Sequence, residues 1–140
     1  MSFQSDVNAA AKRIEKDVAT IGRRVVRAWF DGTVKLTPVD TGRLQGNWQV
    51  SRGTPKGGEL SRTGDSGPLS DIKTVVIGPD NYWLVNNLPY APVVEYGRYG
   101  KGAYTTQKTA GTGFSIQAPR GMARISLTRV RAGLRRLGVK

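Results

Sequence analysis

Few residues in this chain have side chains that could carry out chemistry. Its 140 residues include no histidine and no cysteine, so two of the usual proton-transferring and nucleophilic side chains are missing. No phosphate-binding loop of the G-x-x-x-x-G-K-[ST] type is present. The carboxylates are scattered without any spacing typical of metal ligands; they are Asp6, Glu15, Asp17, Asp31, Asp40, Glu59, Asp65, Asp71, Asp80 and Glu95. The sequence therefore predicts a protein that is not an enzyme and holds no cofactor or metal.

One motif, Asp40-Thr41-Gly42, has a catalytic precedent. It matches the Asp-Thr-Gly triplet in which aspartic proteases pair two carboxylates to activate water. Those proteases embed the triplet in an apolar strand and follow it with a small residue, whereas here Pro38 precedes it and Arg43 follows it at the exit of a predicted helix. We therefore interpret the triplet as a turn that Asp40 caps and in which Gly42 adopts a positive φ.

The charge of the chain is strongly positive. Lysine and arginine total 22 against 10 acidic residues, a formal net charge of +12, which favours polyanions or an acidic partner surface. The end of the chain is especially basic and includes Arg129, Arg131, Arg135 and Arg136. One interpretation is that these cations complement the dipole at the C-terminus of a helix. Another is that they bind phosphate groups or an acidic partner. The plainest is a basic surface that is simply solvated. A small basic nucleic-acid-binding module is thus the alternative function, although the candidate stacking residues Trp48, Tyr82 and Trp83 are more simply core aromatics.

Two helices are predicted from apolar residues that recur at steps of three and four. The first covers residues 5–36, begins at Ser5 or Asp6 and ends before Pro38, with an apolar face of Val7, Ala11, Ile14, Val18, Ile21, Val25, Ala28 and Trp29. The second runs from Arg120, with Pro119 in its first turn and Gly138 beyond its end. Its apolar side comprises Met122, Ile125, Leu127, Val130, Leu134 and Leu137.

Short strands are predicted between these helices. Residues 44–52 alternate apolar and polar side chains, and residues 74–78 and 82–86 are predicted to form a hairpin around Pro79-Asp80-Asn81. The apolar stretch 88–97 is expected to pack on the core, with Pro92 opening a single helical turn. The predicted fold is α+β: one domain over residues 1–140, with a long N-terminal helix packed on a small antiparallel sheet and a C-terminal basic helix.

Two long segments rich in glycine interrupt these elements, at residues 53–70 and 97–115. A compact domain rarely carries two such loops unless they serve a function. We expect both to be mobile until neighbouring subunits order them. The chain also shows no signal peptide and no apolar stretch long enough for a membrane span, so a soluble protein with no membrane partner is expected.

Two segments resemble a known family. The first is Thr37-Pro38-Val39-Asp40-Thr41-Gly42-Arg43-Leu44, followed by Asn47-Trp48, and it resembles the Thr-Pro-x-Asp-Thr-Gly-x-Leu segment of phage tail-completion (neck, head-tail joining) proteins, which include minor tail protein Z-like proteins. The second is Asn86 to Gly97, which resembles the Tyr-Ala-x-x-x-Glu-Tyr/Phe-Gly segment of the same family. Their order and spacing along the chain also agree.

The resemblance implies a virion structural protein that forms a ring, usually a hexamer, at the head-proximal end of a phage tail, where it completes the tail and joins it to the head. The implied partners are other copies of the chain, the tail tube protein and a head-tail connector or adaptor protein. DNA would lie near, in the lumen of the ring. The implied location is the tail-head junction of a virion, and the chain would be made in the host cytoplasm. Family-motif residues expected to be structural are Pro38, Asp40, Thr41, Gly42, Leu44, Tyr90, Ala91, Glu95, Tyr96 and Gly97. The expected interface residues are Arg98, Tyr99, Lys101, Tyr104, Arg129, Arg131, Arg135 and Arg136.

Overall fold

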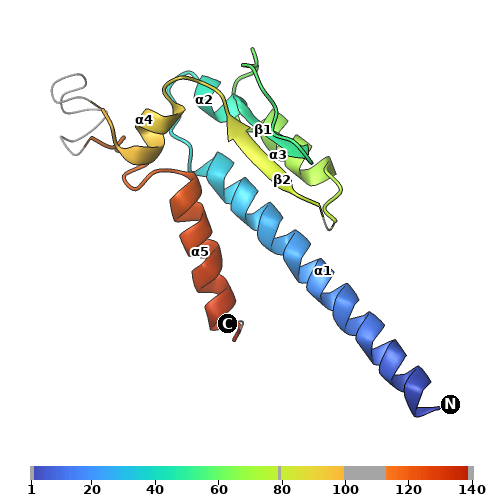
Figure 1. The fold of residues 1–140 in the computed structure, drawn as a ribbon. Coiled ribbons are helices and arrows are strands. Elements are labelled where there is room, and N and C mark those ends of the chain that lie inside the picture. The colour runs from blue at the N-terminus through green and yellow to red at the C-terminus, as the bar shows by residue number, and fades with distance from the viewer. Residues whose placement is uncertain (1, 79, 100–112, 139–140) are drawn as a thin grey trace.

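The computed structural model describes residues 2–78, 80–99 and 113–138. The chain is α+β, with a long N-terminal helix, a two-stranded antiparallel sheet and a C-terminal helix packed against the first. Figure 1 shows that the long helix, α1, extends well beyond the rest of the molecule towards its N-terminus. In chain order the elements are α1 (Phe3–Lys35), α2 (Arg43–Gly46), β1 (Trp48–Arg52), α3 (Ser66–Thr74), β2 (Tyr82–Asn86), α4 (Ala91–Tyr96) and α5 (Ala123–Arg136).

Helix α1 nearly matches the predicted range of 5–36, but it begins at Phe3, before Ser5 and Asp6, the residues predicted to start it. Ser2 caps it, since its Oγ accepts a hydrogen bond of 3.3 Å from the amide of Ser5. Of the predicted apolar face only Val25 and Trp29 are half-buried, and the buried apolar residues of α1, Phe30 and Val34, were not part of that prediction. Residues 2–19 are all exposed, because the sheet and the shorter helices cover only the C-terminal end of α1 (Figure 1).

The two strands of the sheet, β1 and β2, were not predicted to pair with each other. β2 was expected to form a hairpin with residues 74–78, but it lies antiparallel to β1, with Trp48 opposite Asn86 and Arg52 opposite Tyr82. The hairpin prediction is wrong. Residues 43–46 form a helical turn, so the predicted strand 44–52 shortens to β1.

Residues 66–74 form helix α3, which the sequence analysis divided between a loop and a strand. Pro68 lies in its first turn, where proline is tolerated, and Ile72 is buried in the core. The β-branched run that follows, residues 75–77, pairs with no strand among the residues that the structure describes. Side chains meet its backbone instead: Arg27 donates to the carbonyl of Val75 at 3.1 Å, and the Tyr82 hydroxyl donates to the carbonyl of Val76 at 2.8 Å.

The core lies where the C-terminal end of α1 meets the sheet, α3, α4 and the start of α5. Its buried members are Phe30, Val34, Leu44, Trp48, Val50, Ile72, Leu88, Ala91, Val94, Ala118 and Met122. The buried Trp48 indole donates a hydrogen bond of 2.7 Å to Thr37 Oγ1, so the aromatic nitrogen is satisfied. Of the candidate stacking aromatics, Trp48 is thus a core residue, Tyr82 packs partly buried against the core, and Trp83 is exposed.

Helix α5 begins at Ala123, three residues later than predicted, and Pro119 therefore precedes it. Gly121 has φ 87°, which is incompatible with a helix at that position. At the other end Gly138 has φ 77°, as expected for a glycine that follows a helix C-terminus. The helix packs against α1 through Ser126, whose Oγ donates to the carbonyl of Trp29 at 2.8 Å.

Candidate functional site

The two motif segments, far apart in the sequence, meet in the structure. Leu44 from the first segment and Ala91 and Val94 from the second belong to the same buried core. The Asn86 side chain, at the end of β2, donates a hydrogen bond of 2.7 Å to the carbonyl of Leu44. The two segments therefore form one structural unit at the C-terminal end of α1.

The turn at Thr41 and Gly42 has the geometry that the sequence analysis predicts. Gly42 has φ 80°, and a Cβ added there would lie 2.9 Å from the backbone nitrogen of Gly64. Thr41 Oγ1 accepts a hydrogen bond of 3.3 Å from the amide of Arg43, which starts α2. Glycine is thus required at position 42 by both conformation and space. Asp40 is exposed beside this turn.

Beside the turn lies an open hollow of about 700 Å³. Residues of both motifs line it together with the segment before α5; they are Pro38, Val39, Asp40, Thr41, Arg43, Leu44, Tyr90, Val93, Val94, Tyr99, Ser115, Ile116 and Gln117. Partial burial raises the pKa of the Tyr90 hydroxyl, while the nearby Arg43 guanidinium acts in the opposite direction. The Tyr90 hydroxyl is therefore neutral at physiological pH.

Gln117 also lines this hollow, and no feature of the sequence pointed to it. Its side-chain amide accepts a hydrogen bond of 2.8 Å from the nitrogen of Val39 and donates one of 3.0 Å to the Val39 carbonyl. This pair fixes the segment before α5 against the first motif. A single exposed glutamine has no sequence signature, because only the fold decides which backbone it meets.

Glu95, a motif residue, caps the start of α5. Its Oε2 accepts hydrogen bonds from the amides of Met122 (2.7 Å) and Ala123 (3.0 Å), and its Oε1 accepts one of 3.0 Å from the amide of Arg124. A carboxylate at a helix N-terminus also interacts favourably with the helix dipole. The motif glutamate is therefore the link between α4 and α5.

An aromatic side chain and two arginines lie next to this cap. The Arg124 guanidinium carbon lies 4.6 Å from the centre of the Tyr96 ring, and that of Arg98 lies 5.2 Å from it. Gly97 follows in the left-handed conformation with φ 64°, and a Cβ there would lie 2.3 Å from the ring of Phe114. Tyr96, Gly97 and Arg98 thus contribute to local packing at the end of α4.

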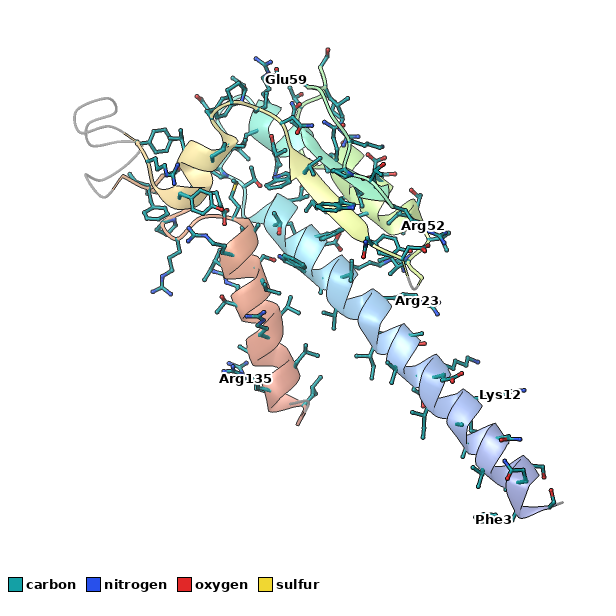
Figure 2. All side chains as sticks on the ribbon, viewed as in Figure 1. Phe3, Lys12, Arg23, Arg52, Glu59 and Arg135 are labelled. Carbon is teal, nitrogen blue, oxygen red and sulfur yellow. The ribbon has the colours of Figure 1, made fainter. Side chains whose placement is uncertain are left out.

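The other expected interface residues differ in their surroundings. Arg98 is exposed, whereas Tyr99 is half-buried and packs against the core. Lys101 and Tyr104 lie outside the described residues. The arginines of α5 are exposed, and Figure 2 shows Arg135 pointing away from α1; the exposed set comprises Arg129, Arg131, Arg135 and Arg136.

The segment 53–65 is held to the body of the protein, contrary to the expectation of a loop that only neighbours would order. Buried Asn47 donates to the carbonyl of Leu60 at 3.0 Å and accepts from its amide at 2.7 Å. Arg62 donates at 2.6 Å to the carbonyls of Gly46 and Trp48. Hydrogen bonds from Asn47, between α2 and β1, and from Arg62 of the segment itself therefore replace the apolar contacts that the segment lacks. Most of the second predicted loop, residues 100–112, lies outside the described residues.

The largest unexpected feature is the exposed apolar face of α1. Its members include Phe3, Val7, Ile14, Val18 and Ile21, with exposed fractions of 84%, 44%, 63%, 64% and 46%. Contiguous apolar surface of this kind marks interaction sites in soluble proteins. The helix therefore offers a docking face that nothing in the described chain covers.

Over residues 2–78, 80–99 and 113–138, no three acidic, histidine or cysteine side chains gather in a way that could hold a metal ion. Within the same residues, none of the helices combines the length and apolarity that crossing a membrane requires. Comparisons with protein-family models, with curated proteins and with solved structures found no match for this chain.

Proposed function

We propose that this chain is a virion structural protein of the phage tail-completion kind, which assembles with copies of itself into a ring at the head-proximal end of a tail. The observation that carries the proposal is the contact between the two motif segments. The side-chain amide of Asn86 donates a hydrogen bond to the carbonyl of Leu44, and Ala91 and Val94 pack with Leu44 in one core. Two segments that resemble one family in order and spacing thus also behave as one structural unit.

The roles of the motif residues support a scaffold. Gly42 and Gly97 take left-handed conformations that place α2 and the end of α4, and Glu95 fixes the start of α5. Each role positions a helix. The projecting apolar face of α1 adds a second argument, because a helix face without intramolecular cover suits a subunit that other chains cover after assembly.

The proposed partners follow from the same resemblance: further copies of this chain, the tail tube protein and the head-tail connector. Ring subunits that bind on two sides need separate surfaces for each neighbour. The chain offers three such surfaces in the described residues, namely the apolar face of α1, the basic helix α5 and the hollow beside Tyr90.

The experiment that tests this function uses the purified full chain. Sedimentation velocity and negative-stain electron microscopy are measured for the chain alone, with isolated tail tubes and with purified connectors. We expect rings and their addition to one end of the tubes. A chain that stays monomeric and binds neither tubes nor connectors contradicts the proposal.

A nucleic-acid-binding module is the second candidate, and one observation favours it. Helix α5 exposes Arg129, Arg131, Arg135 and Arg136 and contains no carboxylate. Clustered arginines on one helix form the electrostatic footprint that binds phosphate groups. The salt dependence of DNA binding, considered in the Discussion, separates this candidate from a purely structural role.

A further inference from the structure

The apolar face of α1 continues along the whole exposed part of the helix. Phe3, Val7, Ile14, Val18 and Ile21 recur at spacings of three, four and seven, which place them on one side of an α-helix. Phe30 is the first buried residue of α1. Isolated helices gain little stability by themselves, so a stripe of this length indicates a packing partner.

Helices α1 and α5 are in close contact at one end and diverge at the other. At the close end, a Cβ added to Gly32 would lie 2.4 Å from Ser126 Oγ. Towards the other end, a Cβ added to Gly22 or Gly133 would meet nothing within 4 Å. Figures 1 and 2 show the two helices separating in this direction. We call the part of the α1–α5 pair beyond this contact the open end.

Apolar side chains border the open end on α5. Val130 and Leu137 lie one and three turns beyond Ser126, on the same side of the helix as this contact residue. Leu137 is 80% exposed. The face that α5 turns towards α1 therefore continues as apolar surface after the two helices separate.

The charges that flank the two apolar faces are opposite in sign. On α1, Asp6 adjoins Phe3, Asp17 adjoins Ile14 and Ile21, and Glu15 adjoins Val18, each at a spacing of three or four. Lys12, in the same segment, lies on the side of α1 that faces away from α5 (Figure 2).

On α5 the flanking residues are arginines. Arg129 lies three residues after Ser126 and one turn before Gly133, and Arg131 lies one turn after Leu127 and three residues before Leu134. Arg129 and Arg131 thus border the apolar face on its two sides. Arg135, in contrast, points away from α1 (Figure 2).

We propose that the N-terminal part of α1, residues 3–21, of one copy docks into the open end between α1 and α5 of a second copy. Apolar side chains would meet apolar side chains, and Asp6, Glu15 and Asp17 would face the α5 arginines of the neighbour. The inference rests on the proposed function in taking a ring as the assembly, and it names the surfaces that join the subunits.

A second copy fits better than other occupants because donor and acceptor surfaces lie on the same chain with opposite flanking charge. Two α5 helices facing each other would bring arginines together, which disfavours a symmetric contact through α5. A donor surface that meets a different acceptor surface gives a head-to-tail contact, and contacts of this type form a ring when the rotation between neighbouring subunits closes.

The first test replaces exposed side chains in the full-length protein. Self-association is measured by sedimentation velocity for Ile14→Gln/Val18→Gln and for Arg129→Glu/Arg131→Glu. Both pairs should weaken self-association by about tenfold or more, because they remove apolar contact or place like charges together. The matched control for the arginine pair is Lys12→Glu/Arg135→Glu, which changes the net charge equally on outward-facing positions and should leave self-association unchanged. Unchanged circular dichroism and melting temperature establish that each variant still folds.

The second test restores the contact by exchanging charges. Asp6→Lys/Asp17→Lys should weaken self-association as Arg129→Glu/Arg131→Glu does. An equimolar mixture of the two variants pairs lysine with glutamate at one contact and aspartate with arginine at the next, so the mixture should recover assemblies of wild-type size. Failure of the mixture to assemble overturns the docking of α1 on α5.

The outcomes separate this inference from the proposed function. Rings that form normally from all of these variants overturn the docking and leave the tail-completion function intact. A wild-type chain that stays monomeric, yet binds tail tubes or connectors through the α1 stripe, also overturns it and assigns the stripe to those partners. Loss of self-association in the designed variants alone, with recovery in the mixture, supports the docking whether or not the chain binds tails.

Discussion

The carboxylate of Glu95 and the backbone amide of Met122 are joined by a hydrogen bond of 2.7 Å. The same carboxylate also accepts from the amides of Ala123 and Arg124. These amides belong to the first turn of α5 and its flank, where backbone donors have no partner within the helix. Glu95 therefore decides where α5 begins and ties that helix to α4.

Replacing Glu95 with alanine should destabilise the protein. The change leaves the amide of the fully buried Met122 without its partner, and unpaired buried donors are costly, so we expect a loss of about 2–4 kcal/mol in the free energy of unfolding. Chemical denaturation measures it. The matched control is Glu59→Ala: Glu59 pairs with Arg43 at 2.7 Å but is 39% exposed against 12% for Glu95. Exposed ion pairs contribute about 0–1 kcal/mol, so equal losses in the two variants would contradict the capping role.

Gly46→Ala should disturb the contact between α2 and the segment 53–65. A Cβ at position 46 would lie 2.4 Å from the carbonyl oxygen of Arg62 and 2.7 Å from Thr63 Cα, and backbone atoms yield little. We expect a loss of about 1–3 kcal/mol, as for overpacked sites in general, measured by thermal or chemical unfolding. Gly57→Ala is the control, because a Cβ there meets nothing within 4 Å. A Gly46→Ala protein as stable as the Gly57→Ala protein would show that the segment adapts freely.

Asn47→Ala should release the segment 53–65 from the body of the protein. Asn47 is completely buried and makes two hydrogen bonds with the backbone of Leu60. Without them we expect trypsin to cleave after Lys56 and Arg62 roughly tenfold faster, since local opening governs proteolysis of folded chains.

The control for this experiment is Asn8→Ala on the exposed part of α1. Asn8 accepts a hydrogen bond of 3.2 Å from the Gln4 side chain at the surface, so its loss should leave cleavage in the segment unchanged. Identical cleavage patterns for wild type and Asn47→Ala would mean that other contacts hold the segment.

DNA binding through α5 gives the second candidate function a quantitative test. If Arg131 and Arg135 contact phosphates, the logarithm of the DNA affinity should fall linearly with the logarithm of the salt concentration. Arg131→Gln/Arg135→Gln should then reduce that slope by about two. Fluorescence anisotropy with duplex DNA measures it, and Lys12→Gln/Lys16→Gln on α1 removes the same charge as a control. No binding near physiological salt, or equal slopes for the two variants, removes this candidate.

Local features of the sequence predicted the elements that depend on local physics. Periodic apolar residues and the proline at position 38 predicted α1, and the same periodicity predicted most of α5. Gly42 was expected to adopt a positive φ, and its φ of 80° confirms it. A helix and a tight turn can be read in this way because their hydrogen bonds join residues only a few positions apart.

Strand pairing could not be read in the same way. Nothing in residues 82–86 tells whether they pair with 74–78 or with 48–52, because both alternatives offer apolar partners of suitable length. In the structure β2 pairs with residues 48–52, because residues 66–74 form α3, which packs Ile72 against the core. The segment 53–65 was wrongly expected to be unsupported for a related reason: Asn47 and Arg62 hold it through backbone atoms distant in the sequence.

The same distinction between local and long-range features applies to the candidate site. By itself the sequence determined a strongly basic chain without histidine or cysteine, two amphipathic helices and two motif segments, because composition and short-range periodicity are properties of the chain alone. Only the tertiary structure decided that Glu95 caps α5 and that the apolar stripe of α1 from Phe3 to Ile21 stays exposed. Periodicity shows that a helix has an apolar face; whether that face is buried depends on which other elements reach it, and here they cover only the end of α1.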